Sequence, residues 1–255
     1  MVVLGSMAAS SVLRAESLKG AHDASGISSA LNHFGVSQED MKKVLAAALE
    51  KGGDYADLFF EHTFNNYVGL QDGAVNRCNS NIDFGVGIRV LAGDQTGYAY
   101  VENVTLKEML NAARTAARIA TGGKATLPVA LTDKPIKTNY YSVKMPWEEV
   151  ILKSKMPYLQ RLNDRIFALD KRVHKVSASL TDTTSHILFC NSEGVMYYDY
   201  RPMVTLGAVC IMEENGKVEN GYAARAYRMG FEFLNDDVVE LLAQEAVAKT
   251  SILFQ

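Results

Sequence analysis

The stretch Gly85–Tyr100 reads GVGIRVLAGDQTGYAY and holds four glycines in sixteen residues. Its first two glycines form the pair G-x-G, with which the phosphate-binding loops of dinucleotide enzymes begin. Such a loop needs a third glycine at residue 90 and a helix after it, so that helix amides meet the pyrophosphate. Residue 90 is valine here, and a strand pattern continues beyond it. The stretch is therefore not predicted to bind a nucleotide.

The same residues predict an antiparallel hairpin. Apolar residues occupy alternate positions from Phe84 to Val90, a turn is indicated at Ala92-Gly93-Asp94, and residues 97–102 return as the second strand. Gly85 and Gly87 are two residues apart and therefore lie on one face of the first strand. That face is left bare, which gives room for another backbone or an aromatic ring, and we expect a neighbouring helix or a peptide to pack there.

Composition places the chain among ordinary globular proteins. It has 255 residues, of which 48% are hydrophobic and 22% charged, and a net charge of −3. This charge gives no support for a nucleic-acid partner. Three cysteines without C-x-x-C spacing argue against a disulfide framework and indicate buried or half-buried thiols. No apolar run reaches the roughly 18 residues that span a bilayer.

Along the chain, helical and strand patterns follow the order helix, meander, helix, helix, meander, helix. Helices are predicted after the capping boxes at Ser37 and Thr105, over about 147–170, and after Asn235. Strands are predicted over residues 55–63, 67–71, 74–78, 84–91, 97–102, 173–180, 186–191, 195–200, 203–213 and 222–233. This order predicts an α+β fold of two similar halves, each a curved antiparallel sheet with helices packed on one face.

Both ends of the chain are unusual. Met1–Ala15 is small and apolar without a preceding basic segment, and it is either the rear of an export signal or a disordered leader. We expect residues 1–35 to be a loosely ordered leader and residues 36–255 to form one domain. The last helix carries an uncapped apolar stripe between Leu241 and Phe254, which is typical of a longer protein or of one that needs a partner.

Side chains that could carry catalysis are scattered. The five histidines are His22, His33, His62, His174 and His186, and none has a metal-ligand spacing with another. His186 and Cys190 lie in a strand pattern, where four residues span about 13 Å, so they are too far apart to share an ion. Ser185 and Ser192 lie in turn-like contexts, without a G-x-S-x-G motif. An independent hydrolase that uses its own histidine, cysteine or serine is therefore the least supported hypothesis.

Aromatic residues gather at two places, around Tyr197, Tyr198 and Tyr200, and at Tyr98 with Tyr100 on one strand face. Such clusters are typical of sheet packing, and the alternative is a peptide-binding or dimer surface, because an extended partner can add to a sheet.

Five short sequences occur in a fixed order between Asp54 and Ala120. They are YADLF at 55–59, LQDG at 70–73, DFGVGIRVLAG at 83–93, GYAY at 97–100 and NAARTAAR at 111–118. Their combination resembles the N-terminal domain of the TldD/PmbA family of bacterial metalloproteases, and the TldD branch more than the PmbA branch. Residues up to about Ala248 fit the same domain more loosely.

The resemblance implies a two-domain protein that works as a dimer and has a link to modulation of DNA gyrase. In the family, a C-terminal domain carries a His-Glu-x-x-x-His motif and a later cysteine. The two histidines hold a metal, expected to be zinc, and the glutamate activates a water molecule for attack on a peptide carbonyl. This sequence has no such motif, and Glu61-His62 is in the reverse order. The resemblance therefore transfers no catalytic or metal-binding residue to this chain.

We predict that the chain is the dimerisation and substrate-guiding domain of a TldD-like zinc metallopeptidase that acts on unfolded peptides, and that it is inactive alone. The alternative is a stand-alone binding or regulatory module that pairs with a full-length relative. The expected partners are a second copy or a TldD/PmbA relative and a peptide substrate, in the cytoplasm unless Met1–Ala15 directs export. The candidate peptide or dimer surface consists of Gly85, Gly87, Arg89, Tyr98 and Tyr100.

Overall fold

The computed structural model describes residues 26–136 and 143–255, so the predicted leader Met1–Ala15 lies outside the described residues. The chain divides into two compact units. Among the described residues, unit 1 contains 26–61, 84–136 and 186–199, and unit 2 contains 62–83, 143–185 and 200–255. Each unit combines strands with helices, as the predicted α+β class requires.

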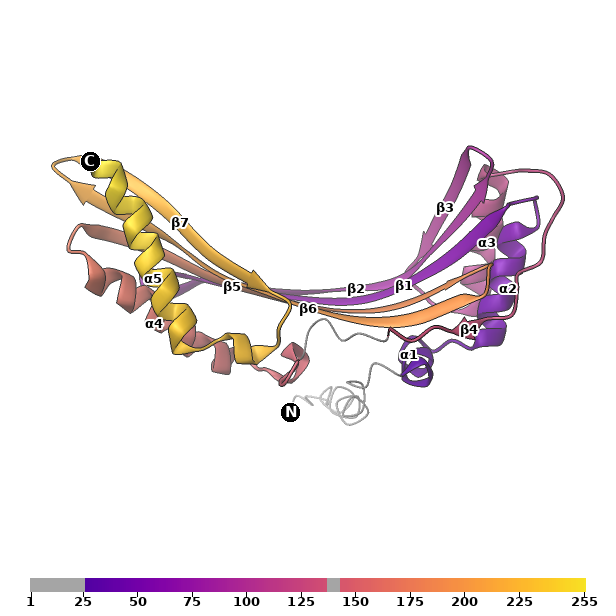
Figure 1. Cartoon of the computed structure of the whole chain (residues 1–255), viewed down its shortest axis with the longest axis horizontal. Helices are drawn as coiled ribbons and strands as arrows, with labels where there is room; N and C mark the ends of the chain where they lie inside the picture. Colours follow the sequence, from indigo (N-terminus) through magenta and orange to yellow (C-terminus); the bar gives the residue numbers. More distant parts are fainter. Residues whose placement is uncertain (1–25, 137–142) are drawn as a thin grey trace, which may run out of the picture. The chain divides into compact units, whose positions relative to one another are not determined.

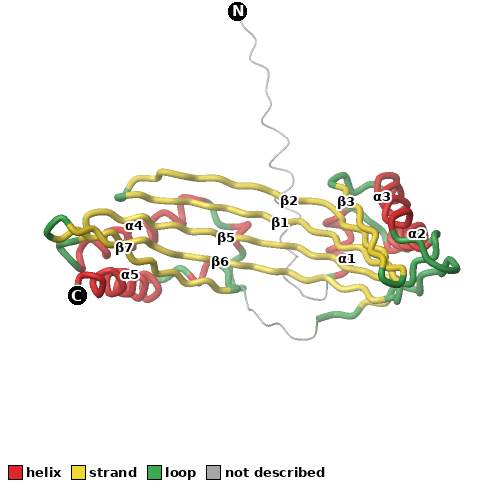
Figure 2. The backbone as a smooth tube through the Cα atoms, turned by 90° about the horizontal axis from the view of Figure 1, so that it is seen from above, coloured by secondary structure: helices red, strands yellow, loops and turns green. Residues whose placement is uncertain are grey.

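Seven strands form one open sheet in the order β3-β2-β1-β5-β6-β4, and β7 also pairs with β6 (Figure 2). Strands β2 and β3 pair antiparallel, as do β6 and β7, whereas the two-residue β4 runs parallel to β6. The α+β fold with an antiparallel sheet is thus confirmed, and the likeness of the two halves stays a prediction. The strands are β1 (Tyr55–Gln71), β2 (Ala74–Ala92), β3 (Gln95–Val101), β4 (Thr132–Asp133), β5 (Val173–Asn191), β6 (Val195–Glu214) and β7 (Lys217–Tyr227).

The strands are longer than predicted, because polar residues continue the ladder where the apolar alternation stops. Residues 173–180 and 186–191, predicted as two strands, are one strand, β5. The residues between them pair with polar residues of β1: Thr183 Oγ1 donates to Asn65 Oδ1 and Thr63 Oγ1 to Ser185 Oγ, each over 2.7 Å. Strands β1, β2 and β6 likewise each join two predicted segments.

In unit 1, helices α2 (Gln38–Leu49) and α3 (Leu106–Ile119) lie beside each other and α3 contacts β3 (Figure 1). The predicted caps are confirmed, since Ser37 accepts a hydrogen bond from the Asp40 amide and Thr105 from the Glu108 amide. One strand face is buried in this unit, with Ala56, Leu58, Phe60, Val86, Ile88 and Val90 in the core.

Helix α1 (Ile27–Phe34) lies in a segment for which the sequence analysis predicts no helix. It ends at Gly35, which is left-handed with φ 67°. The Phe34 side chain is only 3% exposed, and its ring lies 5.6 Å from Phe60 and 5.9 Å from Phe84. Burial of this aromatic ring, rather than a capping signal, holds α1 in unit 1.

In unit 2, α4 (Leu152–Leu169) and α5 (Asp236–Ser251) contact each other, and α5 contacts β7 (Figure 1). The core beneath them includes Val68, Leu70, Leu159, Leu162, Ile166, Val176, Leu206 and Leu242. Helix α4 begins at Leu152 and not at Trp147, because Val150 and Ile151 have extended backbones. Likewise β7 ends at Tyr227, before a short 3-10 turn at Phe231–Phe233 that the sequence analysis assigned to the strand.

The apolar stripe of the last helix is partly buried in unit 2. Asn235 caps α5 as predicted, and Leu242 and Ala246 are fully buried beneath the helix. Leu241, Ile252 and Leu253 remain exposed, whereas Phe254 packs against the core.

Gly97 lets the backbone of α3 lie directly on β3. A Cβ atom at this position would overlap the carbonyl oxygen of Ala116. We expect Gly97→Ala to lower the free energy of unfolding by about 3 kcal/mol, because the helix must move away from the strand. Urea unfolding followed by circular dichroism measures this change.

Gly123→Ala is the matched control, since a Cβ atom there meets no atom within 4 Å. Its unfolding free energy should stay within about 0.5 kcal/mol of the wild-type value. Equal effects of the two substitutions would show that the contact between Gly97 and Ala116 does not limit stability.

Candidate functional site

The structure brings the five predicted site residues together on one face of the β2–β3 hairpin. Gly87 pairs with Tyr100 and Arg89 with Tyr98 in the antiparallel ladder, so these side chains share a face. Gly85 lies on the same face, two residues before Gly87. Val86, Ile88 and Val90 point to the opposite, buried face. We call the five residues with Tyr55 and Asp57 of β1 the tyrosine face.

The space beside the two glycines is filled by the hairpin's own tyrosines. A Cβ atom at Gly85 would lie 2.5 Å from the Tyr100 hydroxyl oxygen, and one at Gly87 would lie 2.5 Å from that of Tyr98. The Tyr100 hydroxyl also donates to the Phe84 carbonyl oxygen over 3.1 Å. The hairpin's own tyrosine rings therefore occupy the space in which a neighbouring helix or a peptide was expected to pack.

The outer surfaces of both rings remain open. Tyr98 is 57% exposed and Tyr100 49% exposed. Because the hydroxyl end of each ring lies over a glycine, the orientation of the ring is restricted before any partner binds, which lowers the entropy that binding would cost.

Arg89 forms an ion pair with Asp57 on this face. Its Nε and Nη2 atoms donate to the same Asp57 carboxylate oxygen over 2.9 and 2.6 Å. The Asp57 side chain is 6% exposed and the Arg89 side chain 48% exposed. The hydrogen bond to Asp57, followed by the carboxylate's charge, raises the pKa of Arg89. The tyrosine face therefore presents a compensated charge, which suits an uncharged peptide better than an anion.

Asp57 and Tyr55 are functional candidates that the sequence analysis did not select. Burial raises the pKa of Tyr55, whose hydroxyl accepts a hydrogen bond from Asn191 Nδ2 over 3.4 Å. The alternation of side chains along YADLF places Tyr55 and Asp57 on the strand face away from the core. This alternation is the sequence signal that could have identified them as candidates. Their position opposite Arg89 depends on the pairing of β1 with β2, and the sequence does not give that register.

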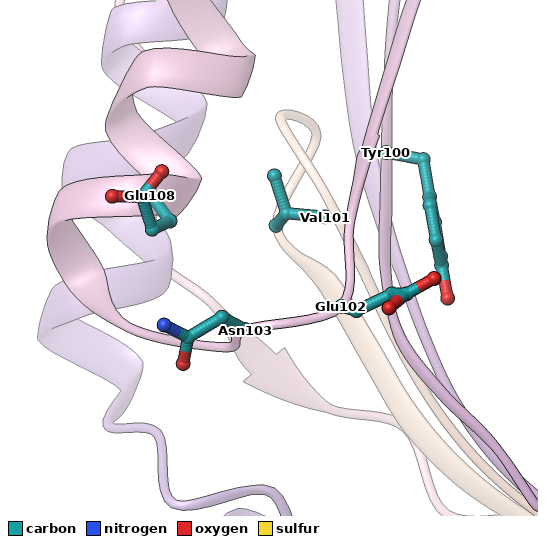
Figure 3. Close-up of a pocket in the computed structure, with 5 residues that line it drawn as sticks. All are labelled: Tyr100, Val101, Glu102, Asn103 and Glu108. Carbon is teal, nitrogen blue, oxygen red and sulfur yellow. The ribbon is translucent and has the colours of Figure 1, made fainter.

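A shallow hollow lies at the end of β3, beside the tyrosine face (Figure 3). Tyr100, Val101, Glu102 and Asn103 line it together with Glu108 of α3. Figure 3 shows Tyr100 and Glu102 on one side of the strand and Val101 on the other, toward the helix. Two carboxylates contribute to the hollow, but they lie on separate elements.

The residues present do not fit a zinc site. Within residues 26–136 and 143–255, no group of three or more histidine, cysteine, aspartate or glutamate side chains is placed to hold a metal ion. The His33 and His186 rings stack with centroids 4.5 Å apart, so their nitrogens do not converge on a point. His186 Nδ1 instead lies 2.7 Å from the Tyr198 hydroxyl.

The candidate nucleophiles are all engaged in packing or in hydrogen bonds. Cys190 is fully buried with its Sγ 3.7 Å from Met41 Sδ, and burial raises the pKa of its thiol. Ser192 Oγ accepts a hydrogen bond from the Ala56 amide over 3.0 Å. Ser185 lies in β5 and not in a turn, and it accepts a hydrogen bond from Thr63 of β1. Burial also raises the pKa of the Cys210 thiol.

The second aromatic cluster is divided between different environments. Tyr197 stacks on Phe189 with ring centroids 5.0 Å apart, and Tyr198 is buried beside His186. In unit 2, Tyr200 donates a hydrogen bond to Glu148 over 3.1 Å. The cluster is thus sheet packing for the most part, as expected from its strand pattern.

Unit 2 contains a buried ion pair that the sequence analysis did not identify. Lys155 Nζ donates to Asp182 over 2.6 Å, and the two side chains are 5% and 2% exposed. Asn66 Nδ2 donates to the other carboxylate oxygen over 2.9 Å, and the ammonium group lies 5.3 Å from the Trp147 ring centroid. Because each charge is compensated, this group attaches α4 to β5 and has no unsatisfied atom to offer a substrate.

Comparisons with known proteins identify two matched segments. Residues 56–120 match the model of the PmbA/TldA metallopeptidase domain 1, and residues 146–254 match that of the PmbA/TldA metallopeptidase central domain. The span 36–255, which the sequence predicts to form one domain, therefore contains two family segments. No helix in the described part of the chain is long and apolar enough to cross a membrane.

Curated relatives and solved structures agree with these matches. The Metalloprotease TldD homolog of Haemophilus influenzae is 31% identical over 207 residues, which cover 78% of this chain and 42% of the relative. A metalloprotease of Methanocaldococcus jannaschii is 25% identical over 193 residues, covering 74% of this chain and 42% of the relative. The chain thus spans about two fifths of the length of the curated relatives that it matches.

Two solved structures share the fold. TldE from Thermococcus kodakarensis has a TM-score of 0.61 at 16% identity. The match covers 83% of this chain and 47% of the TldE chain. A candidate modulator of a DNA gyrase from Thermotoga maritima has a TM-score of 0.64 at 19% identity, with the same coverage.

The three cysteines differ in accessibility, contrary to the prediction that all are buried or half-buried. Cys78 is exposed on β2, whereas Cys190 and Cys210 are buried. We expect a maleimide to label one thiol per native chain and all three in guanidinium, because the buried thiols form little thiolate. Mass spectrometry after brief labelling measures this count.

Cys78→Ser is the control for thiol labelling and should abolish the reaction of the native chain. Rapid native labelling that survives this substitution would show that Cys190 or Cys210 is accessible.

Proposed function

We propose, since the chain belongs to the PmbA/TldD metallopeptidase family, that it is the dimerising and substrate-guiding part of a TldD-like metallopeptidase acting on unfolded peptides. In this proposal, zinc is held by residues outside the present sequence and supplies the activated water for peptide hydrolysis. The residues of this chain bind and orient the peptide and perform no step at the scissile bond.

The tyrosine face is the observation that carries the proposal. Two half-exposed tyrosine rings and an arginine lie side by side on a strand surface, and tyrosine and arginine are the residues enriched in binding surfaces. The rings are held over Gly85 and Gly87, so they offer flat apolar surfaces in fixed positions.

The chemistry of the tyrosine face favours an extended and unfolded chain over a folded ligand. Its components are flat rings, and its charge is compensated by the pair of Arg89 with Asp57. Flat aromatic surfaces contact many side-chain types, so this face would guide peptides with little sequence preference.

The alternative is a binding module that pairs with a full-length TldD/PmbA relative and modifies its activity. It differs from the first proposal in one measurable respect. A guiding domain increases hydrolysis only as part of the same enzyme, whereas a module co-purifies with a separately expressed relative and changes its rate of peptide hydrolysis.

Substitution of Tyr98 tests the guiding role. We expect Tyr98→Ala to weaken binding of a fluorescein-labelled casein peptide by about tenfold, because loss of one central aromatic contact costs on the order of 1.4 kcal/mol. Fluorescence anisotropy with the full chain measures the dissociation constant.

Tyr222→Ala is the matched control. Tyr222 is 56% exposed on β7 and lies over Gly207 as Tyr98 lies over Gly87, but it belongs to unit 2. Its substitution should leave the affinity unchanged. An equal loss in both variants, or no peptide binding by the wild-type chain, would contradict the guiding role of the tyrosine face.

A further inference from the structure

The outer edge of β2 is uncovered in unit 2. All ten residues from Ala74 to Asp83 are exposed although they form part of a regular strand. In the described part of the chain, the strand on the outer side of β2 is β3, and its pairing with β2 runs from Val86 to Ala92. Backbone groups on this edge are therefore available for another strand.

The edge lacks proline and lysine, two residues that commonly block such pairing. Residues 74–83 read AVNRCNSNID, without proline or lysine, and the side chains of Val75 and Ile82 are 52% and 59% exposed. Natural proteins commonly protect a long edge strand with lysine, proline or a bulge. A long edge without proline or lysine is suited to binding another strand.

The edge is also held in one conformation. Ser80 Oγ donates to Asn66 over 2.8 Å, and the Arg77 guanidinium lies 5.2 Å from the centroid of the Tyr67 ring. At the hairpin turn, Asp72 Oδ1 accepts from the Val176 amide and Gln160 donates to the Gly73 carbonyl. A strand ordered in this way loses little entropy when it pairs.

The charges on this edge are complementary to those of a second copy. Arg77 and Asp83 lie three residues to either side of Ser80 on the same strand face. If two copies pair antiparallel about a two-fold axis at Ser80, each Arg77 faces the partner's Asp83. Cys78 then faces the partner's Ile82, which pairs two apolar side chains on the other face.

The length of the free edge selects the same register. It begins after the turn at Asp72-Gly73 and ends where pairing with β3 begins at Val86, so its midpoint lies between Asn79 and Ser80. A two-fold axis far from this midpoint would place the partner's strand beyond one end of the free edge. Charge pattern and edge length therefore agree on one arrangement.

We propose that residues 77–83 of β2 pair antiparallel with the same residues of a second copy, with the two-fold axis at Ser80. The proposal deepens the dimerising role proposed above and is separate from the tyrosine face. Opposed residues in such a ladder have Cα atoms about 4.5–5.5 Å apart, which lies within the range for a disulfide bond. Cys78 of the two copies would be offset by four residues, or about 13 Å.

Disulfide trapping of the full-length chain tests this register. Ser80→Cys combined with Cys78→Ser should give a cross-linked dimer on mild oxidation, whereas the wild-type chain should not cross-link through Cys78. Non-reducing electrophoresis measures the dimer fraction. Absence of the Ser80→Cys dimer, although its thiol reacts with maleimide, would overturn the proposal, as would efficient cross-linking through Cys78.

Charge reversal in the Ser80→Cys, Cys78→Ser background provides the second measurement. Arg77→Asp or Asp83→Arg alone should slow cross-linking about fivefold at low salt, because each creates two like-charged pairs across the axis. The double reversal should restore the rate, and Arg114→Asp on α3 should leave it unchanged. Failure of the double reversal to restore the rate would overturn the proposed pairing.

Binding of the casein peptide separates the two proposals. If the edge variants lose the dimer but keep peptide affinity, the tyrosine face acts independently of β2 pairing. If Tyr98→Ala loses peptide affinity but the Ser80→Cys chain still cross-links, the edge pairing holds by itself.

Discussion

A helix backbone can lie directly on a strand only where the strand has no side chain, and both units depend on this close approach. In unit 1, Gly97 of β3 lies against the Ala116 backbone of α3. In unit 2, Gly221 of β7 lies against the Thr250 backbone of α5, and Thr250 donates a hydrogen bond to the Cys210 carbonyl. Once a helix is seated in this way, it covers one strand face and leaves the opposite face uncovered by that helix. The glycines that define the tyrosine face act on the opposite side of the sheet, where they admit tyrosine rings.

Local signals in the sequence predicted those features that depend on local physics. The caps at Ser37, Thr105 and Asn235 act within one helical turn, and the turn at Ala92-Gly93-Asp94, in which Gly93 is left-handed, needs only its own residues. Strand lengths were predicted less well, since polar residues such as Thr183 belong to β5 through a partner in β1 that is 118 residues away. Helix α1 was missed because Phe34 is held by rings from other elements.

The candidate site also combines features that follow from local sequence with features that depend on distant strands. Residues 85, 87 and 89 and residues 98 and 100 share one strand face, as the period of a strand predicts, whereas their binding role stays a prediction. Asp57 could not be added, because its place beside Arg89 requires the pairing of two strands whose facing residues are 32 positions apart. The burial of Lys155 could not be predicted either, because it depends on Asp182, which lies 27 residues further along the chain.

The polar contacts between β1 and β5 also have a consequence for how the chain is made. Asn66 and Asp182 are separated by 116 residues. At the usual rate of ribosomal synthesis, β5 is therefore completed about ten seconds after β1. During that time the β1–β2 hairpin exposes the side of β1 that β5 later covers. The polar side chains of Thr63, Asn65 and Asn66 make this unpaired edge of β1 hydrophilic. When β5 pairs with β1, the same side chains help to fix its register. We therefore expect this hydrophilic edge to protect the nascent chain against premature association until β5 pairs with β1.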